Sequence, residues 1–201
     1  MLRRANLAVL VSGSGTNLEH LLLAREQGKL FHGTIALVLS DRADAYALKR
    51  AAAHGVPGFA VSRRGKIQTL FEAGLTQKLR EYRVDGIVLA GFLSILSADF
   101  VRLWPERIIN VHPSLIPAFC GKGFYGLKVH AAALERGVRI TGATVHLVNE
   151  EPDGGRILLQ KAVNVLPGDT PESLQRRVME QAEWVLLPQA AEMLCREITG
   201  G

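Results

Sequence analysis

The spacing of apolar residues along the chain predicts strands and helices in alternation. Short apolar runs typical of buried strands occur at residues 7–11, 35–39, 59–61, 86–89 and 108–111. The wider apolar spacing of amphipathic helices follows the first three runs, at residues 18–22, 43–53 and 70–82. Strands that alternate with helices predict a parallel sheet covered by helices.

The second half of the chain departs from this alternation. A long irregular segment, residues 113–126, precedes a helical pattern at 127–136. Two β-rich runs, 140–148 and 157–165, flank a turn-type sequence and predict antiparallel neighbours. Thr170, Pro171 and Glu172 have the residue types of a helix start, so we expect a helix to about residue 196, kinked at Pro188.

These patterns predict one α/β domain over residues 1–201. We expect a Rossmann-like, mostly parallel sheet flanked by helices, with antiparallel strands added in the C-terminal half and a long C-terminal helix. The 48% of hydrophobic residues can form a sizeable core, and no apolar run approaches the roughly 20 residues of a membrane span. We therefore expect a globular protein without a membrane partner.

Cysteine content, the N-terminal sequence and charge bear on the location and the partners of the protein, but they do not identify its function. Cys120 and Cys195 are far apart and form no C-x-x-C motif, so neither a zinc site nor a required disulfide is expected. The first apolar run is short and ends in glycines, so we expect no export signal and a cytoplasmic location. Lys plus Arg exceed Asp plus Glu by 24 to 19, which is compatible with nucleic acid or with anionic substrates.

A glycine-rich loop between the first strand and helix is a candidate anion site. It reads Gly13-Ser14-Gly15-Thr16-Asn17, where main-chain N–H groups and the helix dipole favour a phosphate. Leu18 replaces the third glycine of the dinucleotide fingerprint, and no Gly-Lys-Ser/Thr follows for a P-loop. A tight turn with Thr16 and Asn17 as helix caps remains an alternative.

Asn110, His112 and Asp153 are the candidate catalytic residues. Asn110 and His112 are two positions apart in a strand and would share one face at its carboxyl end. An amide donor beside an imidazole suits oxyanion stabilisation and proton transfer, and Asp153, in a glycine-bordered turn, could pair with the imidazole and favour its charged form. A histidine that caps a turn and an ordinary Asp-Gly hairpin turn are the alternatives.

The remaining histidines show no ligand spacing, so we predict no metal site and interpret each as structural or on the surface. They are His20, His32, His54, His130 and His146.

The order of these motifs resembles the phosphoribosylglycinamide formyltransferase family, within the formyltransferase superfamily. The resemblance spans nearly the whole chain. It rests on Val11-Ser12-Gly13-Ser14-Gly15-Thr16-Asn17-Leu18, Leu89-Ala90-Gly91-Phe92-Leu93-Ser94-Ile95-Leu96, Ile109-Asn110-Val111-His112-Pro113-Ser114-Leu115-Ile116-Pro117, Gly142-Ala143-Thr144-Val145-His146 and Asp153-Gly154-Gly155.

The resemblance implies an activity and a set of site residues. A formyl group would pass from 10-formyltetrahydrofolate, as co-substrate and without a metal, to the amine of 5-phosphoribosylglycinamide in de novo purine (IMP) biosynthesis. Residues 1–105 would form the phosphate-binding half and residues 106–201 the catalytic and folate-binding half. The implied site residues are Asn110, His112 and Asp153 for catalysis, Gly15, Thr16 and Asn17 for the phosphate, Glu183 for the glycinamide end, and Leu93, Ser94, Ile95, Leu96, Asn110, Asn149, Glu150, Glu151 and Pro152 for the folate.

Some positions depart from the family pattern, and other functions compete. The segment 118–126 is unlike the shorter version of many relatives, Arg156 stands where proline is common, and Ser94 replaces an arginine of some members. Formyltetrahydrofolate hydrolase carries a regulatory domain before the first strand, and methionyl-tRNA formyltransferase a separate C-terminal domain. We expect neither here, and therefore small-molecule partners, no nucleic acid, and a monomer or homodimer.

From a different class, a nicotinamide-dinucleotide-binding dehydrogenase could use the glycine loop with Asp41 on the ribose, although the third glycine is missing. A nucleic-acid-binding module would need basic side chains clustered with aromatic ones, and the 6% of aromatic residues are scattered.

Overall fold

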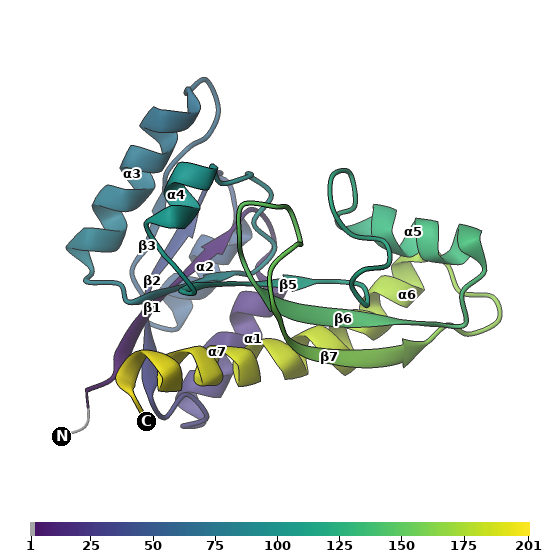
Figure 1. The fold of residues 1–201 in the computed structure, drawn as a ribbon. Helices are drawn as coiled ribbons and strands as arrows, with labels where there is room; N and C mark the ends of the chain where they lie inside the picture. Colours follow the sequence, from purple (N-terminus) through teal and green to yellow (C-terminus); the bar gives the residue numbers. More distant parts are fainter. Residues whose placement is uncertain (1–2) are drawn as a thin grey trace.

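A single seven-stranded sheet organises the chain in the computed structural model, which describes residues 3–201 (Figure 1). The first two residues of the predicted domain lie outside the described part. The strand order is β3-β2-β1-β4-β5-β6-β7, with parallel pairing from β3 to β5 and antiparallel pairing of β5 with β6 and of β6 with β7. The predicted fold class is confirmed. The strands are β1 (Ala5–Val11), β2 (Gly33–Ser40), β3 (Gly58–Ala60), β4 (Gly86–Leu89), β5 (Ile108–His112), β6 (Ile140–Leu147) and β7 (Ile157–Asn164).

Helices cover both faces of this sheet (Figure 1). Side chains of α1, α2, α6 and α7 form one apolar core with the sheet, and those of α3 and α4 form a second core on the opposite face. The helix α5 packs against α6. The helices are α1 (Thr16–Glu26), α2 (Tyr46–Ala53), α3 (Gln68–Glu81), α4 (Ala98–Arg102), α5 (Leu127–Arg136), α6 (Pro171–Val178) and α7 (Trp184–Thr199), with a π-helical turn η1 (Met179–Glu183) before α7.

The central strand β1 shows why this sequence forms a strand covered on both faces. Leu7 and Val9 belong to the first core, whereas Ala8 and Leu10, which point the other way, belong to the second. All four side chains are fully buried. A continuous apolar run is the expected sequence of a parallel strand that lies between two helical layers.

The order of the strands produces a topological switch point at the carboxyl ends of β1 and β4. These strands are adjacent, and the chain continues from β1 into α1 on one face and from β4 towards α4 on the other. Open α/β sheets bind ligands at such a switch point. The main-chain N–H of Ser12 donates to the carbonyl of Gly91 at 3.1 Å, so the glycine-rich loop and the segment after β4 lie side by side.

Two helical features differ from the sequence prediction. The short helix α4, capped by the Ser97 side chain, was not expected. The long C-terminal helix is not continuous: η1 interrupts it, and α7 then runs through Pro188 to Thr199. The irregularity therefore lies in the turn before α7, and α7 includes Pro188 without a break.

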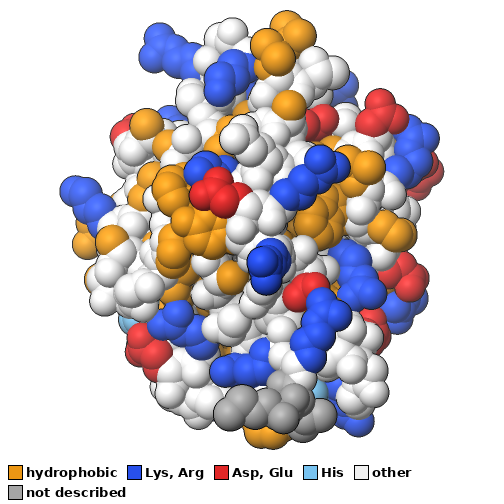
Figure 2. All heavy atoms as spheres, turned by 90° about the vertical axis from the view of Figure 1, so that its left-hand side faces the viewer, with side chains coloured by type: hydrophobic (Ala, Val, Ile, Leu, Met, Phe, Trp, Pro, Cys, Tyr) orange, Lys and Arg blue, Asp and Glu red, His pale blue; other side chains and the backbone are white. Residues whose placement is uncertain are grey.

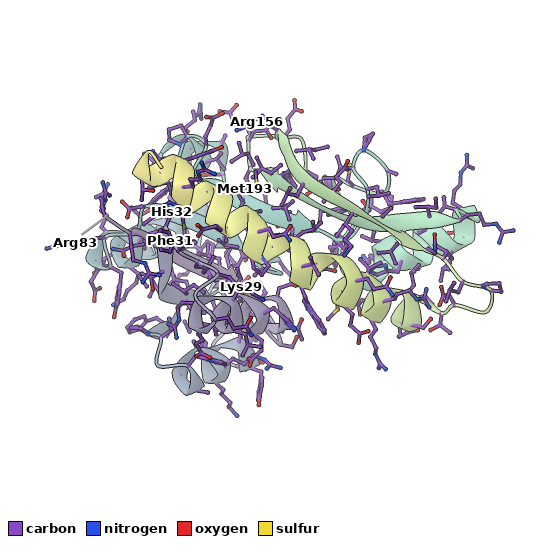
Figure 3. The ribbon with its side chains drawn as sticks, turned by 90° about the horizontal axis from the view of Figure 1, so that it is seen from below. Lys29, Phe31, His32, Arg83, Arg156 and Met193 are labelled. Carbon is purple, nitrogen blue, oxygen red and sulfur yellow. The ribbon has the colours of Figure 1, made fainter. Side chains whose placement is uncertain are left out.

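The helix α7 runs across the lower face of the sheet, with Phe31 and His32 beside it (Figure 3). The ring of His32 lies 2.6 Å from a carboxylate oxygen of Glu192 on that helix. Between residues 3 and 201, no helix combines the length and the apolar character that crossing a membrane requires.

Candidate active site

The three predicted catalytic side chains meet at the carboxyl end of β5. Ile109 and Val111 of this strand belong to the first core, so Asn110 and His112 point to the opposite face, as predicted. Asp153 reaches them from the turn between β6 and β7. Its Oδ2 lies 3.5 Å from Nδ1 of His112, and the two side chains are only 14% and 5% exposed.

A strained turn holds the carboxylate of Asp153 in place. Asp153 has a φ of 56°, in the left-handed region that Asp tolerates better than most residues. Gly155 must be glycine, because a Cβ there would lie 1.8 Å from the carbonyl oxygen of Leu147. The turn therefore packs directly against the end of β6 and fixes the direction from which Asp153 enters the site.

The surroundings of Asp153 keep it ionised. Burial alone would raise the pKa of this carboxyl. The neighbouring His146 side chain at 3.5 Å, the N–H of Gly121 at 2.8 Å and the nearby charge of His112 outweigh burial, so the pKa lies below its ordinary value. The site thus holds a half-buried negative charge beside two imidazoles.

The irregular segment 113–126 folds over His112. The carbonyl oxygen of Phe119 lies 2.9 Å from Nε2 of His112, and Phe119 itself has a φ of 50°. Both ring nitrogens of His112 therefore face oxygen atoms, one of Phe119 and one of Asp153. This arrangement offers an acceptor to each N–H of a doubly protonated ring.

His146 is a site residue that the sequence analysis missed. Its Nε2 lies 3.2 Å from Nδ2 of Asn110 and 3.5 Å from Oδ1 of Asp153, and its Nδ1 lies 2.8 Å from the carbonyl of Leu147. The prediction that His146 is a structural or surface residue did not connect it with the site, whereas the structure buries it beside Asn110 and Asp153. Its register explains why: His146 on β6 is the direct partner of Asn110 on β5, and only strand pairing reveals this.

All nine predicted folate residues line one cavity. The segment after β4 forms one wall and the turn before β7 the other, with Asn110 and His146 at the base. Apolar side chains of Leu89, Val101 and Val148 complete the lining of about 620 Å³ of empty space, part of it open to solvent. Eight of the fifteen lining residues are apolar and seven are polar, a mixture that can bury a small molecule and fix its orientation.

Buried polar side chains hold the segment 93–97 that forms this wall. Ser94 Oγ donates to Asp41 Oδ2 at 2.6 Å, and the main-chain N–H of Ser97 donates to Glu72 Oε1 at 2.6 Å. Asp41 and Glu72 are only 7% and 8% exposed. The carboxylate of Asp41 is thus used to hold the segment, which leaves it poorly placed for the ribose contact of the dehydrogenase alternative.

A second cavity adjoins the first. Asn110 and Asp153 line both cavities, and His112 lines the second together with residues 121–126 of the irregular segment. Among their lining residues, Lys122 is the only Lys or Arg, beside the two histidines His112 and His146. Figure 2 shows many Lys and Arg side chains spread over the face on which β1 begins and the C terminus lies.

The glycine-rich loop and Glu183 also come together, although 166 residues separate them. Asn17 Nδ2 donates to Glu183 Oε2 at 2.7 Å, from the first turn of α1 to the end of η1. Burial raises the pKa of Glu183 to about 7, although the hydrogen bond from Asn17 opposes this. Gly15, with a φ of 74°, has no room for a side chain, because a Cβ would lie 2.6 Å from that of Ala47.

Comparisons with known proteins show which family this chain resembles. The family model described as formyl transferase matches residues 5–190. The chain is 41% identical over 197 residues to phosphoribosylglycinamide formyltransferase, chloroplastic, of Arabidopsis thaliana and 38% identical over 196 residues to the protein of the same name of Vigna unguiculata. These alignments cover 97% of this chain but 67% and 62% of the plant proteins.

A solved structure is similar over almost the whole chain. Glycinamide ribonucleotide transformylase 1 from Symbiobacterium toebii superimposes with a TM-score of 0.90 at 40% sequence identity, covering 96% of this chain and 89% of that one. The family match includes the strand with Asn110 and His112, the turn with Asp153 and the glycine-rich loop. From its sequence, its fold and the arrangement of these residues, the chain belongs to the formyl transferase family.

Proposed function

We propose that this protein transfers the formyl group of 10-formyltetrahydrofolate to the amine of 5-phosphoribosylglycinamide, a step of de novo purine (IMP) biosynthesis. The names of relatives about 40% identical over nearly all of this chain support the reaction. The observation that carries it is the position of Asn110, His112 and Asp153 where two cavities adjoin. Two substrates can meet there without a covalent enzyme intermediate.

The first cavity suits the pteridine ring of the folate. Its apolar walls can pack on the ring faces, and the main chain of segments 93–96 and 149–152 can contact the ring edge. In this proposal, the folate supplies the formyl group on a nitrogen atom. The residues that would hold it are Leu93, Ser94, Ile95, Leu96, Asn110, Asn149, Glu150, Glu151 and Pro152.

The glycine-rich loop and Glu183 suit the two ends of the acceptor. Gly15, Thr16 and Asn17 would bind the phosphate through main-chain N–H groups and the positive end of the α1 dipole. Glu183, held beside Asn17, would bind the amine of the glycinamide end. The hydrogen bond between Asn17 and Glu183 supports one substrate that contacts both residues.

Asn110 and His112 would stabilise the negative charge that develops on the formyl oxygen during attack by the amine. Asn110 directs one N–H towards His146, which leaves its second N–H for that oxygen. The positive charge of a protonated His112, paired with Asp153, acts on the same oxygen. The nitrogen–carbon bond to the acceptor forms first and gives a tetrahedral intermediate with a negatively charged oxygen. Its collapse restores the carbonyl and breaks the carbon–nitrogen bond to the folate.

Asp153 is the residue that can move the proton. The attacking amine loses one proton and the departing folate nitrogen gains one, so the transfer is balanced within the site. An ionised carboxylate can accept the proton from the amine, directly or through a water molecule, and pass it to the leaving nitrogen. The lowered pKa of Asp153 keeps the carboxylate unprotonated before the reaction and makes it a weak base, so it would relay the proton and not retain it.

An acceptor-dependence assay tests the proposed function. Purified protein is mixed with 10-formyltetrahydrofolate, and tetrahydrofolate formation is followed with and without 5-phosphoribosylglycinamide. We expect a rate that saturates with the acceptor and a formylated product in equal amount. Tetrahydrofolate release that ignores the acceptor would instead support a hydrolase and would exclude the proposed transfer.

We further propose that residues 1–105 and 106–201 form the phosphate-binding half and the catalytic half of one domain. The location of Gly15 in the first half and of His112 and Asp153 in the second supports this division. A cytoplasmic location, and a monomer or homodimer as the assembly, stay predictions from the sequence; the two plant relatives are named chloroplastic.

A further inference from the structure

The carbonyl groups of the glycine-rich loop accept hydrogen bonds from the neighbouring helices. The carbonyl of Gly13 accepts from the N–H of Ala47 at 3.1 Å, and that of Ser14 accepts from Nε of Arg50 at 2.9 Å. Both donors belong to α2. The next carbonyl, that of Gly15, accepts from the N–H of Glu19 in α1 at 2.9 Å.

Because of the geometry of the peptide bond, these contacts also determine where the N–H groups of the loop point. In a planar trans peptide, the N–H of each residue points away from the carbonyl of the residue before it. A carbonyl of Gly13 or Ser14 that is drawn towards α2 therefore directs the N–H of Ser14 or Gly15 away from α2. These N–H groups point towards the side on which an anion would approach the loop.

The side chain of Arg50 is itself fixed in position. Its Nη1 donates to Glu19 Oε2 at 2.8 Å, and the guanidinium carbon lies 5.1 Å from the centre of the Tyr46 ring. The other oxygen of Glu19 lies 3.1 Å from Nε2 of His54, which follows α2. One guanidinium thus connects the loop, α1 and α2, and only 27% of the side chain is exposed.

We infer that Arg50 is a positioning residue for the phosphate-binding loop: its Nε holds the carbonyl of Ser14 so that the N–H of Gly15 faces the phosphate of the acceptor. The inference rests on the proposed function, because it takes the loop as the acceptor's phosphate site. Arg50 acts through orientation more than through charge, since Glu19 accepts a hydrogen bond from the same guanidinium and balances it. Of the two contacts from α2 to the loop, this is the one made by a side chain.

Substitution of Arg50 separates orientation from charge. Arg50→Met removes both, whereas Arg50→Lys keeps the charge but loses the planar group that donates to Ser14 and Glu19 together. Lys49→Met is the matched control, because Lys49 is exposed on the same helix and lies over the Tyr46 ring. Each variant is assayed for the KM of both substrates and for kcat.

We expect Arg50→Met to raise the KM for 5-phosphoribosylglycinamide by about tenfold, the effect of one lost charged hydrogen bond. We expect Arg50→Lys to raise it by about threefold or more, and Lys49→Met to leave it unchanged. The KM for the folate and kcat should stay within about twofold of the wild type, because the loop is separate from the folate cavity.

Measurements with the dephosphorylated acceptor and with inorganic phosphate distinguish a positioning role of Arg50 from a merely structural one. With the acceptor that lacks its phosphate, Arg50→Met and the wild type should have equal kcat/KM. In the wild type, inorganic phosphate should shift the amide NMR signals of Ser14, Gly15 and Thr16, and in Arg50→Met it should do so only at about tenfold higher concentration.

The outcomes distinguish the inference from the proposed function. A wild type whose loop signals and activity ignore phosphate on the acceptor would overturn both. A wild type that requires the phosphate, with Arg50→Met equal to Lys49→Met, would overturn only the inference. Two results for Arg50→Met would also overturn the inference, because they indicate general damage to the protein. One is an equal loss of kcat/KM with both acceptors. The other is a change in kcat and in the KM for the folate as large as the change in the KM for the acceptor.

Discussion

Glu183 allows the sharpest test of the electrostatics of the site. The carboxyl is buried, it accepts one hydrogen bond from Asn17, and burial raises its pKa from 4.5 to about 7. The Oδ1 atom of Asn17 is buried and has no hydrogen-bond partner within residues 3–201. A protonated Glu183 adds an O–H donor beside this amide, which supports the neutral form in the free protein.

The raised pKa has a definite consequence for stability. Between pH 4.5 and about 7 the folded protein holds a proton that the unfolded chain has released, so stability falls as the pH rises through this window. Its contribution is complete below pH 4.5 and lost above about pH 7. A pKa displaced from 4.5 to about 7 corresponds to about 3 kcal/mol, since each pKa unit corresponds to about 1.4 kcal/mol.

Glu183→Gln should remove this pH dependence, because a neutral amide replaces an acid that must lose its proton. Free energies of unfolding are measured with urea at pH 5 and pH 8.5 for the wild type, for Glu183→Gln and for Glu180→Gln. Glu180 is an exposed acid in the same turn and serves as the control. The free energy of unfolding of Glu183→Gln minus that of the wild type should rise by about 2–3 kcal/mol between pH 5 and pH 8.5.

The same variant should lose activity while it gains stability at high pH. The amine of the acceptor supplies a further N–H donor that the carboxylate lacks in the free protein, so an ionised Glu183 is useful only when the acceptor is bound. We expect a higher KM for the acceptor in Glu183→Gln. An equal pH dependence of stability in Glu183→Gln and Glu180→Gln would refute the reasoning, as would a carboxyl NMR titration of Glu183 centred near pH 4.5.

Three further variants test other parts of the site. Asp153→Asn should lower kcat by about 100-fold or more with an unchanged circular dichroism spectrum. Because the pKa of Asp153 is lowered, the contribution of its carboxylate to stability is lost only as the pH falls through the pKa of the folded state. The variant should therefore be less sensitive to acid than the wild type below about pH 4. Gly155→Ala places a Cβ 1.8 Å from the carbonyl oxygen of Leu147. The substitution should lower Tm by about 5–10 °C, corresponding to about 2–3 kcal/mol of stability. An unchanged Tm would contradict this packing argument. Ser94→Ala removes the hydrogen bond to the buried Asp41 and should raise the KM for the folate with little change in that for the acceptor, whereas equal changes in both would argue against a local role.

Local patterns in the sequence were sufficient for the order and type of most elements. The apolar run of β1 is continuous because helices cover both faces of the strand, and the glycine-rich loop follows it directly. Asn110 and His112 share a face because side chains alternate in a strand, a property of the backbone alone. The short helix α4 was missed, since five residues carry too little periodicity to be recognised.

The sequence by itself determined the chemistry available: an amide, an imidazole and a carboxylate near the ends of strands, and a loop suited to an anion. Tertiary structure decided which of these groups meet. His146 joins the site because β5 and β6 pair in a particular register, and Asn17 reaches Glu183 across 166 residues because α1 and η1 pack on the same face of the sheet. Such contacts depend on strand order, register and burial, which arise from the whole fold, so no local pattern of residues could predict them.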